Sequence, residues 1–212
     1  KGFQVEQPVF FSLAREYDAT LYSDYMSKRG VKAGAEFRYV MSEDSHGVLM
    51  FDHLHDSKVL DPSIEISSTP KRNNSDRWWL RMKMDHIFKN NWSLRTDIDL
   101  TSDADYLHEF HGGLSGYEKS KEQFIDSFGR DIDEFDDTTR ESSININRVF
   151  KGMSFNGGIR WFDNTIARQN DLIDTTLQHL PEISLSILKQ PIGKMPIYFD
   201  MESQYNFFYR KD

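Results

Sequence analysis

The sequence predicts an all-β protein, an antiparallel meander of about ten long strands. Apolar and polar residues alternate with a period of two through most of the chain, which is typical of strands with one apolar face. Many alternating segments reach the roughly 9 to 11 residues that a tilted strand needs to cross a bilayer, whereas soluble strands usually have about five or six. Tight turns join many neighbouring segments, as expected for a meander.

The alternation is clearest in segment 91–102. Leu94 and Ile98 point to one face of this strand, whereas Arg95 and Asp97 point to the other, because successive side chains of a strand face opposite sides. The same pattern predicts the remaining strands. The full set comprises 3–14, 17–27, 31–42, 47–55, 76–88, 91–102, 140–150, 153–163, 179–189 and 195–209.

The connections between strands alternate in length. The tight turns include 15–18, 28–30, 89–91 and 150–152. The longer connections are 56–75, 103–139 and 164–178. Long connections on one side of a sheet and short turns on the other are typical of barrels, and we expect the long ones to face outward.

The longest connection is expected to contain helix. Segment 102–110 begins with capping and acidic residues, which helix N-termini prefer. Tyr117, Phe124 and Phe128 recur at helical spacing. Phe135 lies among acidic residues, and we expect it in a solvated loop.

Composition limits the classes of function. The net charge is −8 with both signs mixed along the chain, which argues against a nucleic-acid partner. There is no cysteine, so a disulfide-stapled secreted domain is excluded. No apolar run approaches the roughly 18 residues of a membrane helix. The mean hydropathy of −0.65 suits a soluble protein, but a membrane barrel shows similar values because its two faces alternate.

The chain starts at Lys1, without an initiator Met or a signal peptide. We therefore expect it to be a segment of a longer protein whose targeting information lies upstream.

Two clusters are candidate metal sites. His53 and His55 lie on one strand face between Asp52 and Asp56, and two imidazoles at this spacing can share a metal; the alternative is a polar strand end. The acidic run 131–137 offers carboxylates to calcium. It lacks the glycine and terminal glutamate of an EF-hand loop, and an ordinary charged loop is the favoured alternative. We predict no metal and no cofactor.

Asp97 and Asp99 share a strand face about 7 Å apart, as paired catalytic carboxylates do. Strand alternation explains them without chemistry. Neither a nucleophile elbow nor a phosphate-binding loop occurs, so the sequence predicts no enzyme.

The aromatic content of 14% is high. Trp78, Trp79, Trp92 and Trp161 lie near strand ends and in mid-strand. This distribution is typical of aromatic girdles at the membrane interface. The alternative is the core of a soluble sandwich.

Four motifs near the start of the chain resemble one family. Residues 8–14 form an aromatic strand after a proline, followed by Tyr-Asp-Ala-Thr at 17–20, Tyr-Met-Ser-Lys-Arg-Gly at 25–30 and Glu-Phe-Arg-Tyr at 36–39. These motifs, in this order, resemble the LptD (OstA) family of lipopolysaccharide-assembly proteins of the Gram-negative outer membrane. The resemblance continues through 77–80, 97–110 and 180–183.

The resemblance implies a very large outer-membrane β-barrel after a periplasmic jelly roll. Residues 1–212 would then be a partial transmembrane barrel, without the jelly roll and the remaining strands. Ten strands cannot close such a barrel, so an open sheet with exposed edges is expected. The family also folds loops into its barrel interior.

The family's first and last strands pair poorly and form a lateral gate. Pro8 fits this because proline cannot donate a ladder hydrogen bond. Some members carry a second proline where this chain has Ser23, so the seam here is expected to be stiffer. The residues expected at the gate are Pro8, Phe11, Leu13, Asp18, Thr20, Leu21 and Tyr25.

The polar strand face would line a hydrated lumen. We expect a wet wall there, not a tight binding site, which passes sugar and phosphate groups. The residues expected to line it are Glu36, Arg38, Arg81, Lys83, Arg95, Asp97, Asp99, Asp200 and Glu202.

By resemblance, the partners are lipopolysaccharide, outer-membrane lipid, the plug lipoprotein LptE and a periplasmic LptA-type bridge reached through the jelly roll. Two other hypotheses remain open. One is a different outer-membrane barrel, such as a porin or receptor, and the other is a soluble β-sandwich that binds glycans.

Overall fold

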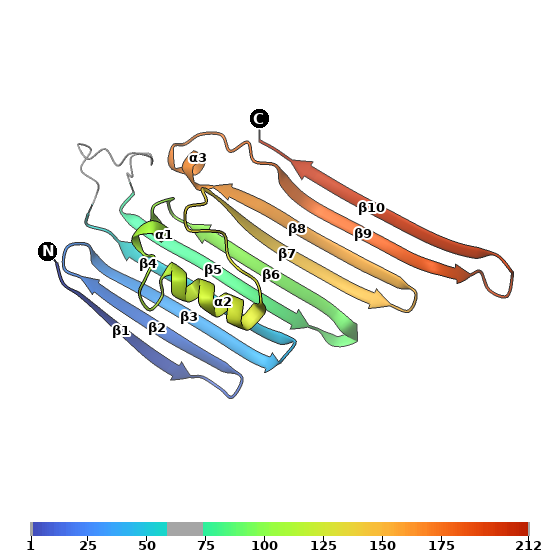
Figure 1. Cartoon of the computed structure of the whole chain (residues 1–212), viewed down its shortest axis with the longest axis horizontal. Helices are drawn as coiled ribbons and strands as arrows, with labels where there is room; N and C mark the ends of the chain where they lie inside the picture. The colour runs from blue at the N-terminus through green and yellow to red at the C-terminus, as the bar shows by residue number, and fades with distance from the viewer. Residues whose placement is uncertain (1, 59–73, 212) are drawn as a thin grey trace.

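The computed structural model describes residues 2–58 and 74–211, which form one ten-stranded antiparallel sheet in the order β1 to β10 (Figure 1). All ten predicted strands are present, and most of the predicted connection 56–75 lies outside the described residues. The strands are β1 (Gln4–Ser12), β2 (Tyr17–Met26), β3 (Gly30–Ser42), β4 (Ser45–His55), β5 (Asp76–Ile87), β6 (Trp92–Thr101), β7 (Thr139–Phe150), β8 (Met153–Asn164), β9 (Gln178–Pro191) and β10 (Tyr198–Tyr209).

The sheet is open. β1 pairs with β2 and β10 pairs with β9, so each end strand has one unpaired edge within the described part of the chain. The meander of long strands is therefore confirmed, while closure into a barrel stays a prediction.

Residues paired directly across neighbouring strands share a face, and the register separates two faces of different chemistry. The apolar face is largely exposed; Phe51 is 41% and Leu21 48% exposed. One row across its β2–β6 part contains Leu21, Ala35, Phe51, Leu80 and Leu100. The matching row on the polar face contains Thr20, Glu36, Met50, Arg81 and Asp99.

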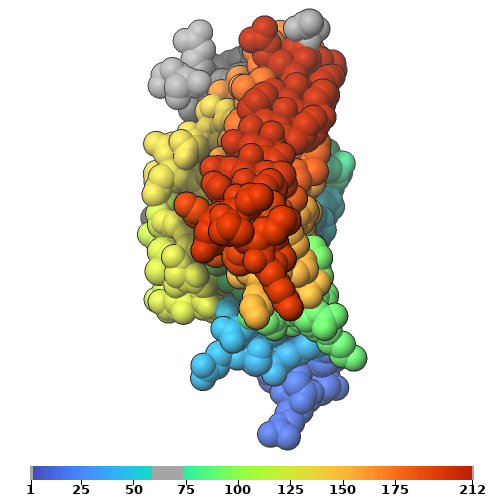
Figure 2. Space-filling view, turned by 90° about the vertical axis from the view of Figure 1, so that its right-hand side faces the viewer, coloured from blue at the N-terminus to red at the C-terminus, as the bar shows by residue number. Residues whose placement is uncertain are grey.

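The connection between β6 and β7 folds back over the polar face. We call residues 102–138 the cap; it contains α1 (Tyr106–Glu109) and α2 (Tyr117–Phe128), which confirms the predicted helices. The cap lies over β3–β6 in Figure 1 and projects from one side of the sheet in Figure 2. The cap therefore covers this part of the polar face, where the sequence predicted a wet wall.

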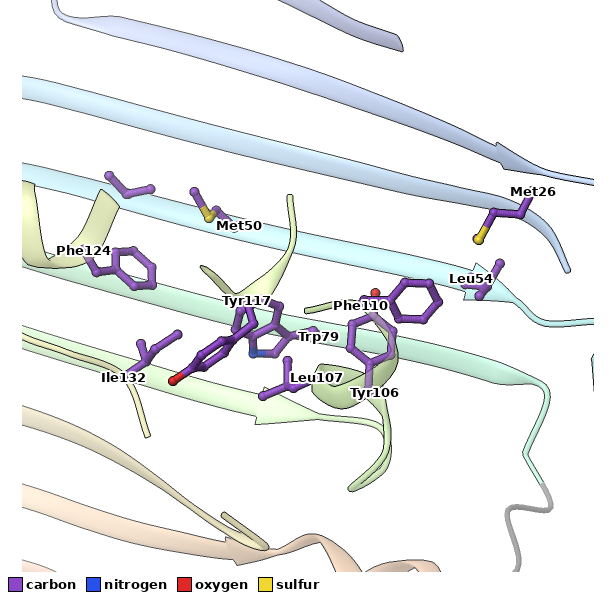
Figure 3. Packing of buried hydrophobic residues seen from close by; sticks show 11 residues of the cluster. Met26, Met50, Leu54, Trp79, Tyr106, Leu107, Phe110, Tyr117, Phe124 and Ile132 are labelled. Atoms are coloured by element: carbon purple, nitrogen blue, oxygen red, sulfur yellow. The ribbon is translucent and has the colours of Figure 1, made fainter. Parts of the chain in front are cut away.

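Aromatic and aliphatic side chains fill the space between the cap and the sheet (Figure 3). Trp79 of β5 and Phe124 of α2 are fully buried there. Trp79 is therefore not part of an aromatic girdle, because it lies on the polar side of β5 beneath the cap. Phe135 also packs against this cluster, with its ring edge-on to Tyr117 at 5.7 Å between centroids, so the expectation of a solvated Phe135 is wrong.

Helix α2 buries one side and ends at a glycine. Its buried residues Tyr117, Ser120 and Phe124 are three or four apart, which places them on one side of the helix. Gly129 ends it in the left-handed conformation, with φ of 62° and its N–H bonded to the C=O of Ile125; glycine adopts this conformation without steric cost. The amphipathic side of α2 thus sets how the cap lies on the sheet.

Two short helical segments lie in the other connections. The turn between β5 and β6 contains η1 (Lys89–Asn91), and α3 (Thr165–Gln169) follows β8. The sequence reading missed α3, whose first turn is capped by Asn164 Oδ1 accepting from the N–H of Ala167 at 3.0 Å. No helix in residues 2–58 and 74–211 has the length and apolar character needed to cross a membrane.

Packing under the cap generates a first prediction. Phe124→Ala removes a fully buried ring and should weaken docking of the cap by about 3 to 5 kcal/mol. The matched control Ile125→Ala changes a neighbouring residue that is 44% exposed and should cost no more than about 0.5 kcal/mol. Hydrogen exchange of cap amides in the full-length protein measures both. Equal exchange in the two variants would contradict the packing described here.

Candidate functional site

The cap is anchored by a fully buried arginine. Arg77 of β5 donates from Nε and Nη2 to both carboxylate oxygens of Asp103, at 2.9 and 2.7 Å. Its Nη1 also donates to Glu109 at 2.9 Å and to Asp56 at 3.3 Å. Asp103 lies at the start of the cap and Glu109 at the end of α1, so one strand residue holds two points of the cap.

A second arginine of the same strand holds the middle of the cap. Arg81 Nη1 donates to Asp52 of β4 at 2.8 Å, and its Nη2 donates to the C=O of Ser115 at 2.8 Å. Its Nε donates to Ser120 Oγ of α2 at 3.0 Å. The guanidinium also stacks 3.9 Å from the ring centre of Trp79, an arrangement that favours arginine.

The far end of the cap is held by carboxylates of the sheet. Arg130 bridges Asp85 of β5 at 2.7 Å and Asp97 of β6 at 3.1 Å. Asp97 also accepts from Lys83 Nζ at 2.9 Å. The polar face and the cap therefore carry complementary charges along two strands, β5 and β6.

These buried charges have little tolerance for loss of a partner. Removing water from an ion is expensive, and the cost is offset only when partners satisfy each group. Each oxygen of the Asp103 carboxylate accepts a hydrogen bond from Arg77, and charge-assisted pairs of this geometry are among the strongest in proteins. The arrangement is suited to fixing the cap in one position.

Burial and hydrogen bonding shift the pKa values of several side chains in the cap. Burial raises the pKa of Asp133 above its ordinary value, and burial raises the pKa of Tyr117 to about 12. The hydrogen bond from Lys121, 2.6 Å from Glu134, lowers the pKa of Glu134. Tyr117 thus remains a neutral donor to Glu134 at 3.1 Å.

The expected lumen residues lie on the polar face in three environments. Glu36, Arg81, Lys83 and Asp99 are buried beneath or beside the cap. Arg38 and Arg95 lie at its margin in exposed ion pairs with Asp18 and Asp85. Asp97 is partly buried between Lys83 and Arg130 at the edge of the cap. Asp200 and Glu202 lie on β10, well away from the cap and exposed.

The cap also covers the start of β7, where Arg140 is buried and donates to the C=O groups of Asp133 and Glu134. The rest of the polar face, over the remainder of β7 and β8–β10, is not covered by the cap (Figure 1). Its central row is uncharged and consists of Asn147, Asn156, Ser184 and Gln204. Neighbouring rows add Asn145, whose amide donates to Asn156 at 2.9 Å. Two polar surfaces therefore exist, one covered and charged, the other open and rich in amide and hydroxyl groups.

The expected gate residues lie on β1, β2 and the turn between them. Phe11, Leu13, Leu21 and Tyr25 are exposed, from 42% to 59%. By register, Pro8 pairs with Tyr22, Thr20 with Glu36, and Asp18 with Arg38. The seven residues thus divide between the apolar face and the polar face, and their role at a gate stays a prediction.

Backbone hydrogen bonds show which side of β1 each residue faces. Ser27 N–H donates to the C=O of Phe3, and Leu13 N–H donates to the C=O of Tyr17, both at 3.1 Å. Backbone groups of successive strand residues point alternately toward the partner and away from it. The odd-numbered residues therefore bond to β2, and Pro8 faces the unpaired edge.

Pro8 interrupts that edge twice. It has no N–H to donate, and its C=O accepts from the Nε2 of Gln7 at 2.9 Å. The pairing of β1 with β2 is unaffected and continues in register through all nine residues of β1. The loss of ladder hydrogen bonds thus falls on the outer edge of the sheet.

The other candidate sites from the sequence have structural partners. His55 Nδ1 lies 2.8 Å from Asp76 Oδ1, and His53 Nε2 lies 3.8 Å from the same oxygen. Asp97 and Asp99 are paired with cationic side chains, Asp99 with Arg140. Within the described ranges, no group of three or more potential ligands is arranged to hold a metal ion.

Sequence reasoning missed the residues that anchor the cap. Arg77, Asp103, Glu109 and Asp52 were not assigned a site, although Arg77 and Asp103 lie within motifs of the family resemblance. A usable signal was the series of cations at alternate positions on β5, Arg77, Arg81 and Lys83, facing a connection rich in acidic residues.

The fold and these surfaces define a class of protein: an antiparallel β wall with an exposed apolar face and a charged polar face partly filled by its own chain. The comparisons with known proteins agree. The family model "LptD: LPS transport system D" matches residues 75–212, well over half of the chain. The chain belongs to the LptD family.

Several relatives named LPS-assembly protein LptD are similar to this chain. The protein of Xanthomonas oryzae pv. oryzae (strain MAFF 311018) is 28% identical over 207 residues, 98% of this chain and 20% of the relative. That of Vibrio vulnificus (strain YJ016) is 33% identical over 117 residues, 55% of this chain and 14% of the relative. The chain thus spans a fifth or less of the length of these relatives.

The ion pairs of Arg77 generate a second prediction. Arg77→Ala leaves Asp103 and Asp56 buried without this cation and should destabilise the docked cap by roughly 3 to 5 kcal/mol. The control Arg160→Ala removes an exposed pair with Glu141 at 3.3 Å and should cost about 0 to 1 kcal/mol. Protease cleavage within the cap, followed against urea concentration, compares the variants. A cap that resists cleavage equally in both would show that Arg77 does not anchor it.

Proposed function

We propose that this chain forms part of the wall of an outer-membrane translocon that inserts lipopolysaccharide into the outer leaflet. The observation that carries the proposal is the two-faced sheet in a chain of the LptD family. The exposed apolar face suits lipid, and the polar face suits a hydrated interior. The chain acts as a conduit and catalyses no reaction.

The proposed site of lateral exit is the free edge of β1. Pro8 cannot donate there and Gln7 occupies its C=O, so a last strand arriving at this edge forms fewer ladder hydrogen bonds. Ser23, where some relatives carry a second proline, keeps its N–H, which makes β2 the firmer strand of the two. Phe11, Leu13, Leu21 and Tyr25 then offer apolar contact to acyl chains at the seam.

The saccharide and phosphate groups pass along the polar face. The open part over β7–β10 offers amide and hydroxyl groups, and Arg38 and Arg95 offer charge-assisted hydrogen bonds to phosphate at the cap margin. The plug lipoprotein LptE within the lumen and an LptA-type bridge through an upstream jelly roll complete the proposed path.

The two alternative functions receive less support. A porin or receptor barrel is disfavoured because the matched relatives are named as LPS-assembly proteins. A soluble β-sandwich needs a second sheet over the apolar face, and residues 2–58 and 74–211 form one sheet.

Photo-crosslinking in cells tests the proposal. A photoreactive residue placed in turn at Phe11, Leu13, Leu21 and Tyr25 of the full-length protein should yield lipopolysaccharide adducts. The control position Leu188 on β9 is also apolar and 67% exposed, but it lies far from the β1 edge and should yield at least about tenfold less adduct than Leu21, since proximity governs the reaction. Absence of adducts at all four positions, with the protein still in the outer membrane, would contradict the proposal.

A further inference from the structure

Two adjacent residues of the cap bond to two separate strands of the sheet, β5 and β1. The C=O of Ser115 accepts from Arg81 of β5 at 2.8 Å. The N–H of the preceding residue, Leu114, donates to Glu6 Oε2 of β1 at 3.2 Å. Arg81 is itself fixed by Asp52. The segment 114–115 therefore connects the buried ion pairs of the sheet to its edge strand.

The acceptor Glu6 is held in place for this contact. Gln4 Nε2 donates to Glu6 Oε1 at 3.2 Å and to Asp24 Oδ2 of β2 at 3.0 Å. Gly113 approaches so closely that a Cβ there would lie 2.7 Å from Glu6 Oε1, and its φ of +95° is unfavourable for other residues. The approach of the cap to β1 thus depends on a glycine at this position.

β1 has few other attachments. Its backbone pairs with β2 alone, and its other edge is free. Within the described residues, Glu6 is the β1 side chain whose hydrogen bond reaches beyond β1 and β2. An edge strand held on one side frays more readily than an internal strand, so one additional contact has a large share in its order.

We propose that Glu6 is a positioning residue through which the cap holds β1 against the sheet. The tip of the cap, residues 110–115, acts as a strap from β5 to β1. Movement of β1 away from the cap then requires release of the Glu6 contact, while the Arg77 and Arg81 anchors stay in place. The consequence for lipid exit rests on the proposed function; the holding of β1 does not.

Hydrogen exchange in the purified full-length protein with its plug lipoprotein tests the strap. Glu6→Ala should raise exchange of the peptide covering β1 roughly threefold to tenfold, as expected for loss of one hydrogen bond. Glu6→Gln retains an acceptor oxygen and should stay near the wild-type rate. Gly113→Ala displaces Glu6 and should behave like Glu6→Ala. Exchange of the β3–β5 peptides should not change in any variant.

The proposal is overturned if exchange of β1 is the same in Glu6→Ala as in the wild type, or if Glu6→Gln exchanges as fast as Glu6→Ala. Crosslinking at Leu21 in the same variants separates this result from the proposed function. If the protein with wild-type Glu6 gives no lipopolysaccharide adduct at Leu21, the proposed lipid exit is wrong. The exchange result on β1 would still stand. Faster exchange of β1 with more adduct at Leu21 in Glu6→Ala is the expected outcome.

Discussion

The structure depends on one electrostatic constraint: Arg77 and Arg81 point from β5 into a space that excludes water, and each needs anionic or carbonyl partners. β4, the start of the cap and α1 supply those partners as Asp52, Asp103 and Glu109. Because an unpaired buried charge costs several kcal/mol, the cap cannot leave the sheet without exposing these groups together. The position of α2, the burial of Trp79 and the division of the polar face follow from this pairing.

The cap changes what the polar face can do. Over β3–β6 the face is occupied by the chain itself, through a core of aromatic side chains and ion pairs. Over the remainder of β7 and β8–β10 it stays open and uncharged along its central row. In the proposed conduit, hydrated cargo therefore moves past β7–β10 or over the outer surface of the cap, and the β1 edge lies beside the tip of the cap. In that proposal, the covered part of the sheet acts as a rigid support and the open part as a passage.

The sequence alone predicted the strands of the sheet, but it did not predict the residues that anchor the cap. Period-two alternation predicted all ten strands because strand geometry is local, and spacing at 117–128 predicted α2 for the same reason. The pairing of Arg77 with Asp103 spans the β5–β6 hairpin and depends on where the cap folds back, which no local pattern encodes. Trp79 and Phe135 were misplaced because the type of a residue does not determine which segment of the chain packs over it. The direction in which Pro8 faces required the register of β1 with β2.

The cap fills the polar face over β3–β6 and the start of β7, and leaves the remainder of β7 and β8–β10 open. Cysteine labelling in the full-length protein tests this arrangement most directly, because residues 1–212 contain no cysteine and the introduced thiol is then the reactive one within this region. Met50→Cys places a thiol where the side chain is 4% exposed, whereas Asn147→Cys and Gln204→Cys place it on the open face. A polar maleimide should modify the two open positions at least about a hundredfold faster, since reaction at Met50 requires opening of the cap. Equal labelling of Met50→Cys and Asn147→Cys would contradict the account.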